Sequence, residues 1–475
     1  MRKPPRALAA AFAAAFFATA AQAAPLHRYA VKVDESLEQL TVTACFDGDL
    51  PQTLTADDGA SRFLQSMRID AAPASTIVVQ ANEASIAGAA RNACVNYSVQ
   101  LQPRVRGRQT GGPETRRIDR DLLTAIGDWL WRPALLADGE DIELSFDLPP
   151  AVAVSAPWPR VSDARNPRYR LAGTPADWQG VVAFGRFRPV AIDVPGARVE
   201  LAIIGDADAA QREFARGWIE RTVRGVAAGY GRFPAPALQV IVAPSDQRGR
   251  SPVPWAYVAR GGGAAVHLFV DLSRRPEDIE RDWSFTHELS HLFLPYMDSR
   301  DAWLFEGLPT YLQNVLMARN GTISEAEAWR RMHEGFGRGA GVGEGLSLQD
   351  ASQRMGRGGL YLRAYWGGAA YMLAADMRLR RQKDAARSLD SVLAGLARCC
   401  SDTMRRYSAE EIVAQLDRAS GTSVFSELAA EWIERPGFPD YERLFRELDI
   451  EMLGGFPILN DGPGAAIRRG IMGKR

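Results

Sequence analysis

Charge imbalance, cysteine and long apolar runs are all scarce in this chain of 475 residues. The 57 Lys and Arg residues balance the 57 Asp and Glu residues, so no excess of basic charge points to nucleic acid as a partner. Cysteines number only four, and none shows the spacing of a metal knuckle. Beyond the first residues no segment is long and apolar enough to span a membrane. What remains is the composition of a soluble globular protein, with 46% hydrophobic and 24% charged residues.

The first 23 residues are predicted to be a secretory signal. Arg2, Lys3 and Arg6 precede an apolar run over 7–20, and an A-x-A sequence then predicts cleavage after Ala23. The run is shorter than the roughly 20 residues that a spanning helix needs, which argues against a permanent anchor. A periplasmic or secreted protein without stable membrane insertion is therefore expected.

The four cysteines form two pairs in the sequence. Cys45 and Cys94 lie in alternating, strand-like segments, and a disulfide between them suits an oxidising compartment. Cys399 and Cys400 are adjacent, so a vicinal bridge, two free thiols and pairing elsewhere all stay open.

Hydrophobic periodicity divides the remaining chain into three regions and predicts a multi-domain α+β fold. Residues 24–195 alternate apolar and polar residues between Pro- and Gly-rich turns, which predicts an N-terminal β-sandwich with one helical segment over 119–131. Residues 196–335 mix strands and helices. Residues 336–475 are predicted to be mostly helical and to complete a cleft.

In the mixed region, strands are expected at 199–204, 238–242 and 264–271, and helices at 208–228, at 276–296 and from 302 onward. Later helices are expected at 323–336, 360–382, 385–396 and 409–419. Ser408 and Glu411 form a capping-box signature for the last of these. The glycine-rich segment 335–345 is expected to be a loop near the cleft.

Among only five histidines, His287 and His291 stand four residues apart in the sequence HELSH. Side chains at this spacing project from one face of a helix, so both imidazoles can reach one metal ion. Glu288 lies beside the first histidine and can reach a water molecule on that metal. His267 is expected to be structural or to line the cleft, and His333 to face solvent.

A zinc hydrolase site needs three protein ligands and an open position, so a third ligand is expected downstream. Glu306 is the best candidate, because the fourteen residues between it and His291 allow a turn and the start of a returning helix. Asp298 and Asp301 lie in the expected turn and are weaker rivals. Glu288 is the expected general base, since zinc lowers the pKa of bound water to about 7.

A hydrogen-bond donor should face the oxyanion that forms when water attacks a carbonyl group. Tyr365 is the candidate, because Gly367 and Gly368 follow it and would let its helix pass close to the metal. Tyr361, one helical turn earlier, is its main competitor. Packing in the core is the alternative role for either tyrosine.

In this order, HELSH, WLFEGLPTYL (303–312) and YWGGAAYMLAADMRLR (365–380) resemble the motifs of the gluzincin metallopeptidases. Within that group the chain is most similar to the glycyl aminopeptidase family of secreted bacterial enzymes. The resemblance implies a thermolysin-like zinc catalytic domain over 196–335 that acts on peptides or proteins. It also implies Zn²⁺ as cofactor, with His287, His291 and Glu306 as ligands and Glu288 and Tyr365 as catalytic residues.

Three features depart from these relatives. The interval between His291 and Glu306 is shorter than in the large aminopeptidases, and no PDZ domain, with which the glycyl aminopeptidases often end, is expected. Aminopeptidases of the group also carry a Gly-x-Met-Glu-Asn strand whose glutamate binds the free amine of the substrate. The matching place is expected at Gly261, Gly262 and Gly263, which supply glycines but no glutamate. These glycines, with the strand after them as a peptide-binding edge, are substrate-binding candidates. A simple hairpin turn is the alternative.

The sequence thus predicts a secreted or periplasmic zinc metallopeptidase, with aminopeptidase action implied by the resemblance. One alternative is a catalytically impaired binding or envelope-assembly protein that keeps the gluzincin fold. Another is a hydrolase of a different amide or ester. The oligomeric state is not encoded in any feature of the sequence.

Overall fold

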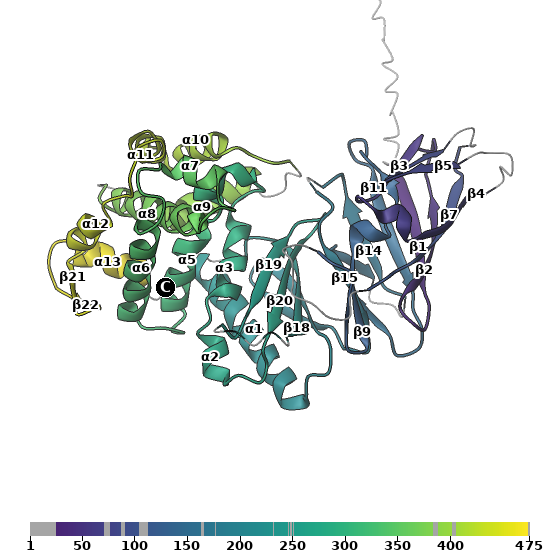
Figure 1. Ribbon diagram of the computed structural model, residues 1–475, viewed down its shortest axis with the longest axis horizontal. Coiled ribbons are helices and arrows are strands. Elements are labelled where there is room, and N and C mark those ends of the chain that lie inside the picture. Colours follow the sequence, from purple (N-terminus) through teal and green to yellow (C-terminus); the bar gives the residue numbers. More distant parts are fainter. Residues whose placement is uncertain are drawn as a thin grey trace, which may run out of the picture.

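A computed structural model describes residues 25–473 except 71–76, 87–90, 104–112, 163–165, 176, 231, 246, 248, 250, 383–387 and 401–404. The predicted signal peptide lies outside the described residues. Figure 1 shows a sheet-rich N-terminal region, a central sheet and a helical C-terminal region side by side. The predicted multi-domain α+β class is confirmed.

Three sheets that share one apolar core make up the N-terminal region. The largest has the order β13-β14-β11-β1-β2-β7-β4, and two four-stranded sheets have the orders β10-β3-β6-β5 and β12-β15-β9-β8. Alternate residues of β1, such as Tyr29 and Val31, are buried against residues of the smaller sheets, such as Leu54 and Phe184. The strands are β1 (Leu26–Val33), β2 (Gln39–Cys45), β3 (Thr53–Thr55), β4 (Leu64–Ile69), β5 (Ile77–Gln80), β6 (Glu83–Ile86), β7 (Cys94–Gln100), β8 (Arg116–Ile118), β9 (Asp121–Ala125), β10 (Arg132–Pro133), β11 (Asp141–Asp147), β12 (Ala153–Ser155), β13 (Arg160–Ser162), β14 (Arg168–Ala172) and β15 (Val181–Gly185).

A disulfide joins Cys45 of β2 to Cys94 of β7, as predicted. The two cysteines are directly opposite each other in the antiparallel pairing of these strands. The side chains of Cys399 and Cys400 lie outside the described ones.

The helix predicted over 119–131 is wrong. The segment forms β9 and a single 3-10 turn at Ile126–Asp128. All five residues of β9 are buried, so the strand lacks the polar alternation that would have identified it. Asp121 accepts hydrogen bonds from the N–H groups of Arg186 and Gly205, which ties this strand to the next region.

The central sheet has the order β16-β17-β18-β20-β19 and positions the candidate site. β17, β18 and β20 run parallel, while β16 and β19 pair antiparallel at the two edges. Its strands are β16 (Val190–Val194), β17 (Ala197–Ile203), β18 (Ala237–Pro244), β19 (Trp255–Ala259) and β20 (Ala264–Val270). The boundary expected at 195/196 falls in the turn between β16 and β17, so this sheet begins before it. β19 had no counterpart among the expected strands.

The two faces of the central sheet are covered differently. One face packs against the helices through Val240, Val242, Val266 and Leu268, among others. The other packs against β9 and β15 of the N-terminal region through a separate apolar cluster that includes Ile241.

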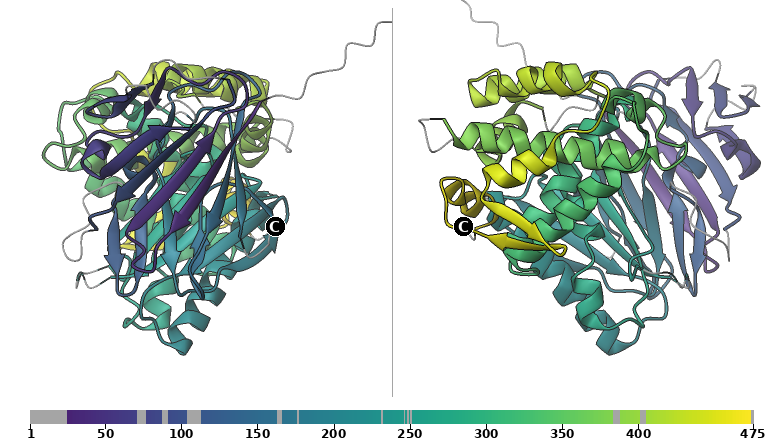
Figure 2. Two further views of the ribbon diagram at one scale, coloured as in Figure 1. Left: turned by 90° about the vertical axis from the view of Figure 1, so that its right-hand side faces the viewer. Right: turned by 60° about the vertical axis from the view of Figure 1, so that its left-hand side comes forward.

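The helices are α1 (Ala209–Tyr230), α2 (Pro276–Glu280), α3 (Ser284–Ser290), α4 (Ala302–Phe305), α5 (Gly307–Arg319), α6 (Glu325–Ala340), α7 (Leu348–Gln353), α8 (Leu360–Arg380), α9 (Leu389–Cys400), α10 (Ala409–Ser420), α11 (Val424–Trp432), α12 (Tyr441–Glu447) and α13 (Ala465–Met472). A hairpin of β21 (Ile450–Leu453) and β22 (Phe456–Leu459) lies between the last two, on the side away from the N-terminal sheets (Figure 2). The capping box of Ser408 and Glu411 is present at the start of α10.

Two helix predictions need correction. The single helix expected over 276–296 is divided into α2, α3 and a 3-10 turn at His291–Phe293. Between α2 and α3 the Asp282 carboxylate accepts the N–H of Ser284. The glycine-rich segment expected as a loop begins inside α6, which continues to Ala340. Among the described residues, the helices lack the combination of length and apolar character that crossing a bilayer requires.

Candidate metal centre

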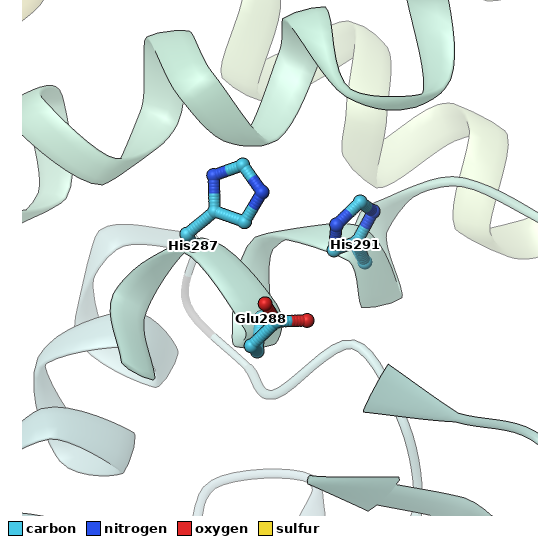
Figure 3. Close-up of side chains that lie close together, drawn as sticks. All are labelled: His287, Glu288 and His291. Atoms are coloured by element: carbon cyan, nitrogen blue, oxygen red, sulfur yellow. The ribbon is translucent and has the colours of Figure 1, made fainter. Parts of the chain in front are cut away.

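Helix α3 carries His287, and His291 begins the 3-10 turn that directly follows it. The α3 side chains are buried from Ser284 to His287, because this helix packs between the central sheet and α5. Figure 3 shows both imidazoles beside each other with the Glu288 carboxylate close by. The ligand atoms of His287, Glu288 and His291 lie within 4.8 Å of one another, so the sequence spacing does bring them to one point.

Glu306, which lies between α4 and α5, completes this group. Its Oε2 atom lies 3.2 Å from Nε2 of His287 and 3.4 Å from Nε2 of His291. Three potential ligand atoms, two imidazole nitrogens and one carboxylate oxygen, thus converge from two segments of the chain. This donor set is the one that a catalytic zinc ion takes in many hydrolases.

Close packing of α5 against α8 brings Tyr365 to the same point. A Cβ atom on Gly307 would lie 2.6 Å from the backbone of Gly368, and one on Gly368 would lie 1.7 Å from the carbonyl oxygen of Trp303. Only glycine permits this approach. Gly368 therefore has the role expected of it, whereas Gly367 faces the side chain of Leu348.

Tyr365 lies over the metal-binding group. Its ring is stacked on that of His287 with the centroids 6.1 Å apart, and its hydroxyl lies close enough to the Glu306 carboxylate for that group to raise its pKa. Tyr361, its competitor, is 49% exposed and touches the group only through the edge of the Tyr365 ring. Of the two tyrosines, Tyr365 is the one that can reach a reacting carbonyl.

Several further residues hold the imidazoles in place. The Oε1 atom of Gln313 lies 2.8 Å from Nδ1 of His287, which leaves Nε2 free for a metal. The rings of Trp283 and Phe305 pack on His287 and His291 with centroid distances of 5.2 and 4.5 Å.

Burial and neighbouring charges set the protonation of the group. Burial raises the pKa of Glu288 even though His291 and His287 act against it. Burial alone would also raise the pKa of Glu306, but the adjacent histidines outweigh it and hold that pKa well below its usual range. The pKa of Tyr365 is raised by burial and by the Glu306 and Glu288 carboxylates, so its hydroxyl keeps its proton.

The group is open on one side. The histidine side chains are almost fully buried, whereas Glu306 keeps 13% of its side chain exposed and Glu288 and Tyr365 are also partly exposed. A cleft of about 830 Å³ adjoins this side, and its lining includes Trp283, Gln313 and Tyr365. An open position next to a cleft is what a hydrolytic metal site requires, as opposed to a closed structural one.

The rival ligands lie elsewhere. Asp298 pairs with Arg300 at 2.8 Å, and Asp301 accepts the N–H of Ala409 at 2.8 Å. His267 is buried beside Gln239, and burial lowers its pKa to about 3. The expectation that His333 faces solvent is wrong, because it is half-buried against Tyr441 and Phe445 and pairs with Glu442.

The structure gives Gly261, Gly262 and Gly263 a packing role. They form the turn between β19 and β20, where a Cβ on Gly261 or Gly263 would lie 1.9 Å from a backbone oxygen of Gln179 or Pro157. Gly262 has φ +88°, and a Cβ there would collide with Leu171. The glycines thus allow the central sheet to meet the N-terminal region.

The strand after these glycines cannot serve as a peptide-binding edge. β20 is paired on both sides, with β18 and β19, so its backbone groups are already used. The edge strand beside the site is β19, whose backbone at Val258 faces the Glu288 carboxylate and lowers its pKa. Arg260 directly follows β19, and its guanidinium donates a hydrogen bond to the carbonyl of His291.

Three residues that contact the site were not predicted from the sequence: Gln313, Val258 and Trp283. Gln313 carries a usable signal, because it lies seven residues after Glu306, the residue that precedes α5, and thus about two helical turns further along the same face. Val258 offers none, since its contribution is a backbone group.

Comparison with known proteins finds likeness at the level of structure alone. No family model and no curated protein matches the sequence. An aminopeptidase N family protein from Idiomarina loihiensis superposes with a TM-score of 0.66 at 13% identity, covering 89% of this chain and 78% of that one. An M1 zinc metallopeptidase from Deinococcus radiodurans superposes with a TM-score of 0.57 at 14% identity, covering 88% of this chain and 96% of that one.

A form of the Deinococcus enzyme bound to a Tyr-Ser-Ala substrate gives the same superposition. The narrower resemblance to the glycyl aminopeptidases stays a prediction, because no sequence match supports it. In its layers and their order along the chain, this protein has the fold of the M1 zinc metallopeptidases.

Proposed function

We propose that this protein is a zinc-dependent metallopeptidase that hydrolyses peptide bonds. The observation that carries the proposal is the convergence of His287, His291 and Glu306 on one point that is open to a cleft. The donor set fits zinc, and the Gln313 contact leaves the correct histidine nitrogen available. The M1 zinc metallopeptidases that share the fold are consistent with this assignment.

When bound, zinc would polarise the scissile carbonyl and acidify water at this site. Glu288 would take a proton from the attacking water and pass it to the leaving amine. Burial raises the pKa of that carboxylate, which suits a group that must both accept and release a proton.

Tyr365 would donate its hydroxyl proton in a hydrogen bond to the carbonyl oxygen as negative charge develops there. Its raised pKa keeps that proton on the oxygen. For this the hydroxyl has to turn from Glu306 to the substrate. This movement requires only a rotation of the tyrosine side chain.

The substrate backbone would pair with β19, the edge strand next to Glu288. β19 carries no acidic residue and is followed by the cation Arg260, so it offers no carboxylate for the ammonium group of a free N-terminus. We therefore propose that blocked N-termini are accepted and that internal peptide bonds are cleaved as well as terminal ones.

Export to the periplasm or the medium is part of the proposal. It is supported by the signal-like first 23 residues and by the disulfide between Cys45 and Cys94, which forms in oxidising compartments.

The decisive experiment compares the wild type with Glu288→Gln on a mixed peptide library with free and acetylated N-termini. Metal content is measured by mass spectrometry in parallel. We expect both proteins to bind one zinc ion, and the variant to lose hydrolysis by about 10²- to 10⁴-fold, the usual contribution of a general base.

Equal hydrolysis by the two proteins would refute the mechanism. Zinc binding without hydrolysis of any peptide by the wild type would instead favour a binding protein that keeps the fold.

A further inference from the structure

The cleft beside the metal centre extends from α3 to α6. Its inner end consists of residues that touch His287, namely Trp283, Gln313 and Tyr365, and its outer wall includes Arg338 of α6. The volume of about 830 Å³ lies within the roughly 300–1,000 Å³ of ligand-binding pockets. A substrate held at the metal can therefore extend along this wall.

The charges that line the cleft are mostly satisfied within the protein. Five arginines and four carboxylates line it: Arg274, Arg281, Arg330, Arg331, Arg338, Asp278, Asp282, Glu327 and Glu334. Each carboxylate has a partner: Glu327 pairs with Arg330 and Arg331, Glu334 with Arg330, Asp278 with Arg275, and Asp282 accepts from Ser251. Three of these carboxylates are thus neutralised by arginines, and the fourth, Asp282, is buried and bonded to Ser251.

Four of the five arginines are paired as well. Arg274 pairs with Asp271 at 3.3 Å, and Arg281, Arg330 and Arg331 all contact Glu327. Within the described part of the chain, Arg338 is the one cleft-lining arginine without a carboxylate partner. Its guanidinium lies over the ring of Trp366, 5.4 Å from the centroid.

The position of Arg338 suits the recognition of a substrate. Trp366 directly follows Tyr365 in α8, so the guanidinium is stacked on the residue next to the proposed oxyanion donor. Stacking on an aromatic face leaves the N–H edge of a guanidinium free. Trp283 and Tyr361, which line the same cleft, are 44% and 49% exposed and offer apolar surfaces to a side chain.

We propose that Arg338 binds a carboxylate group of the peptide substrate, which rests on the proposed peptidase function. Two sources of that carboxylate share this chemistry: the C-terminus of a short peptide, and an Asp or Glu side chain of a longer one. The planar guanidinium can form two parallel hydrogen bonds with a carboxylate, which a carboxamide cannot match.

Glu334 is the nearest competing carboxylate in sequence, four residues before Arg338 on α6. It is occupied by Arg330 on the preceding turn, which in turn is held by Glu327. The guanidinium of Arg338 thus remains available to an incoming anion.

The test uses matched peptides cleaved by the wild type and by Arg338→Gln. One pair differs only in a free or amidated C-terminus, and a second pair, amidated throughout, differs only in one Glu or Gln. We expect the wild type to prefer one or both acidic peptides by about five- to tenfold in kcat/KM, mainly through KM, since an exposed ion pair is partly screened by water. The pair that shows the preference identifies the source of the carboxylate.

In Arg338→Gln that preference should vanish while cleavage of the uncharged peptides stays the same. Arg338→Lys should keep part of the preference, because it retains charge but loses the paired hydrogen bonds. Arg274→Gln is the matched control, because it removes a paired arginine from the same cleft and should leave the preference intact. A wild type indifferent to both carboxylates, or a variant that keeps the preference, would overturn the assignment.

Binding to the Glu288→Gln protein separates this inference from the proposed function. Fluorescent versions of the same peptides are titrated into Glu288→Gln with and without Arg338→Gln. A loss of affinity for the acidic peptides alone supports carboxylate binding by Arg338 even if the wild type cleaves no peptide. Equal affinities in both proteins would contradict it whatever the activity.

Discussion

The two faces of the central sheet use polar residues in opposite ways. On the helical side, two imidazoles and two carboxylates are held together within an apolar cluster and open to a cleft. On the side of the N-terminal region the contact is mostly apolar, and its buried polar groups are bonded within the protein. Gln239 contacts His267, Glu200 pairs with Arg160, and Asp121 accepts the backbone N–H groups of Arg186 and Gly205. Buried charges are costly unless they are paired or bind a metal. The group on the helical side has the donor set of a metal site and opens to a cleft, so function is expected there.

The comparison predicts that substitutions on the helical side change chemistry and that substitutions on the other side change stability. Three experiments test this distinction.

Replacing Glu306 with Ala should have the largest effect. It removes one of three proposed zinc ligands, so zinc content should fall and hydrolysis should drop by more than the roughly 100-fold that loss of a partner to a ligand can cost. Metal analysis and kcat/KM measure the two effects. Asp298→Ala is the control, because this residue pairs only with Arg300 and should leave both unchanged. Full zinc occupancy in Glu306→Ala would show that Glu306 is not a zinc ligand.

Replacing Gln313 with Ala should have a smaller effect of the same kind. The change removes the acceptor beside Nδ1 of His287, so zinc affinity or activity should fall by about 10- to 100-fold. Competition with a chelator measures the affinity. Gln313→Glu keeps an acceptor and should restore most of it. An unchanged affinity in Gln313→Ala would show that the imidazole is oriented by packing alone.

Replacing Gly261 with Ala tests the other side of the sheet. The new Cβ would meet the backbone oxygen of Gln179, and overpacking of this kind costs about 1–3 kcal/mol in the free energy of unfolding. Thermal unfolding should register the loss, while kcat/KM of the folded protein stays at the wild-type value. Gly356→Ala, with open space around the new Cβ, serves as control. A fall in kcat/KM without a loss of stability would instead show that the glycines contribute to substrate binding.

The metal-binding group could be predicted because its signals are local. His287 and His291 are brought together by spacing alone. Glu306 follows them after a turn, and Tyr365 directly precedes the glycines that allow a close approach of its helix. The presence of Gly368 correctly predicted a close approach of its helix, which packs against Gly307 at the start of α5. Each of these inferences needs only the geometry of an α-helix.

The substrate-binding strand could not be predicted in the same way. Whether β19 or β20 lies at the edge depends on pairing with β18, which precedes both in sequence. The prediction for β9 was wrong for a related reason. The strand is buried on both faces, so its sequence lacks the alternation of apolar and polar residues. From the sequence, Gly261 was predicted to be part of a binding motif. The structure shows that a side chain at this position would collide with the backbone of Gln179.

The sequence by itself predicted the α+β class, the disulfide, and the residues that meet at the proposed zinc site, because spacing along a helix fixes which side chains share a face. The tertiary structure alone decided which strand faces the substrate, that Gln313 holds His287, and that Arg338 has no carboxylate partner among the described residues. Those outcomes depend on contacts between segments far apart in the chain, which local spacing does not encode.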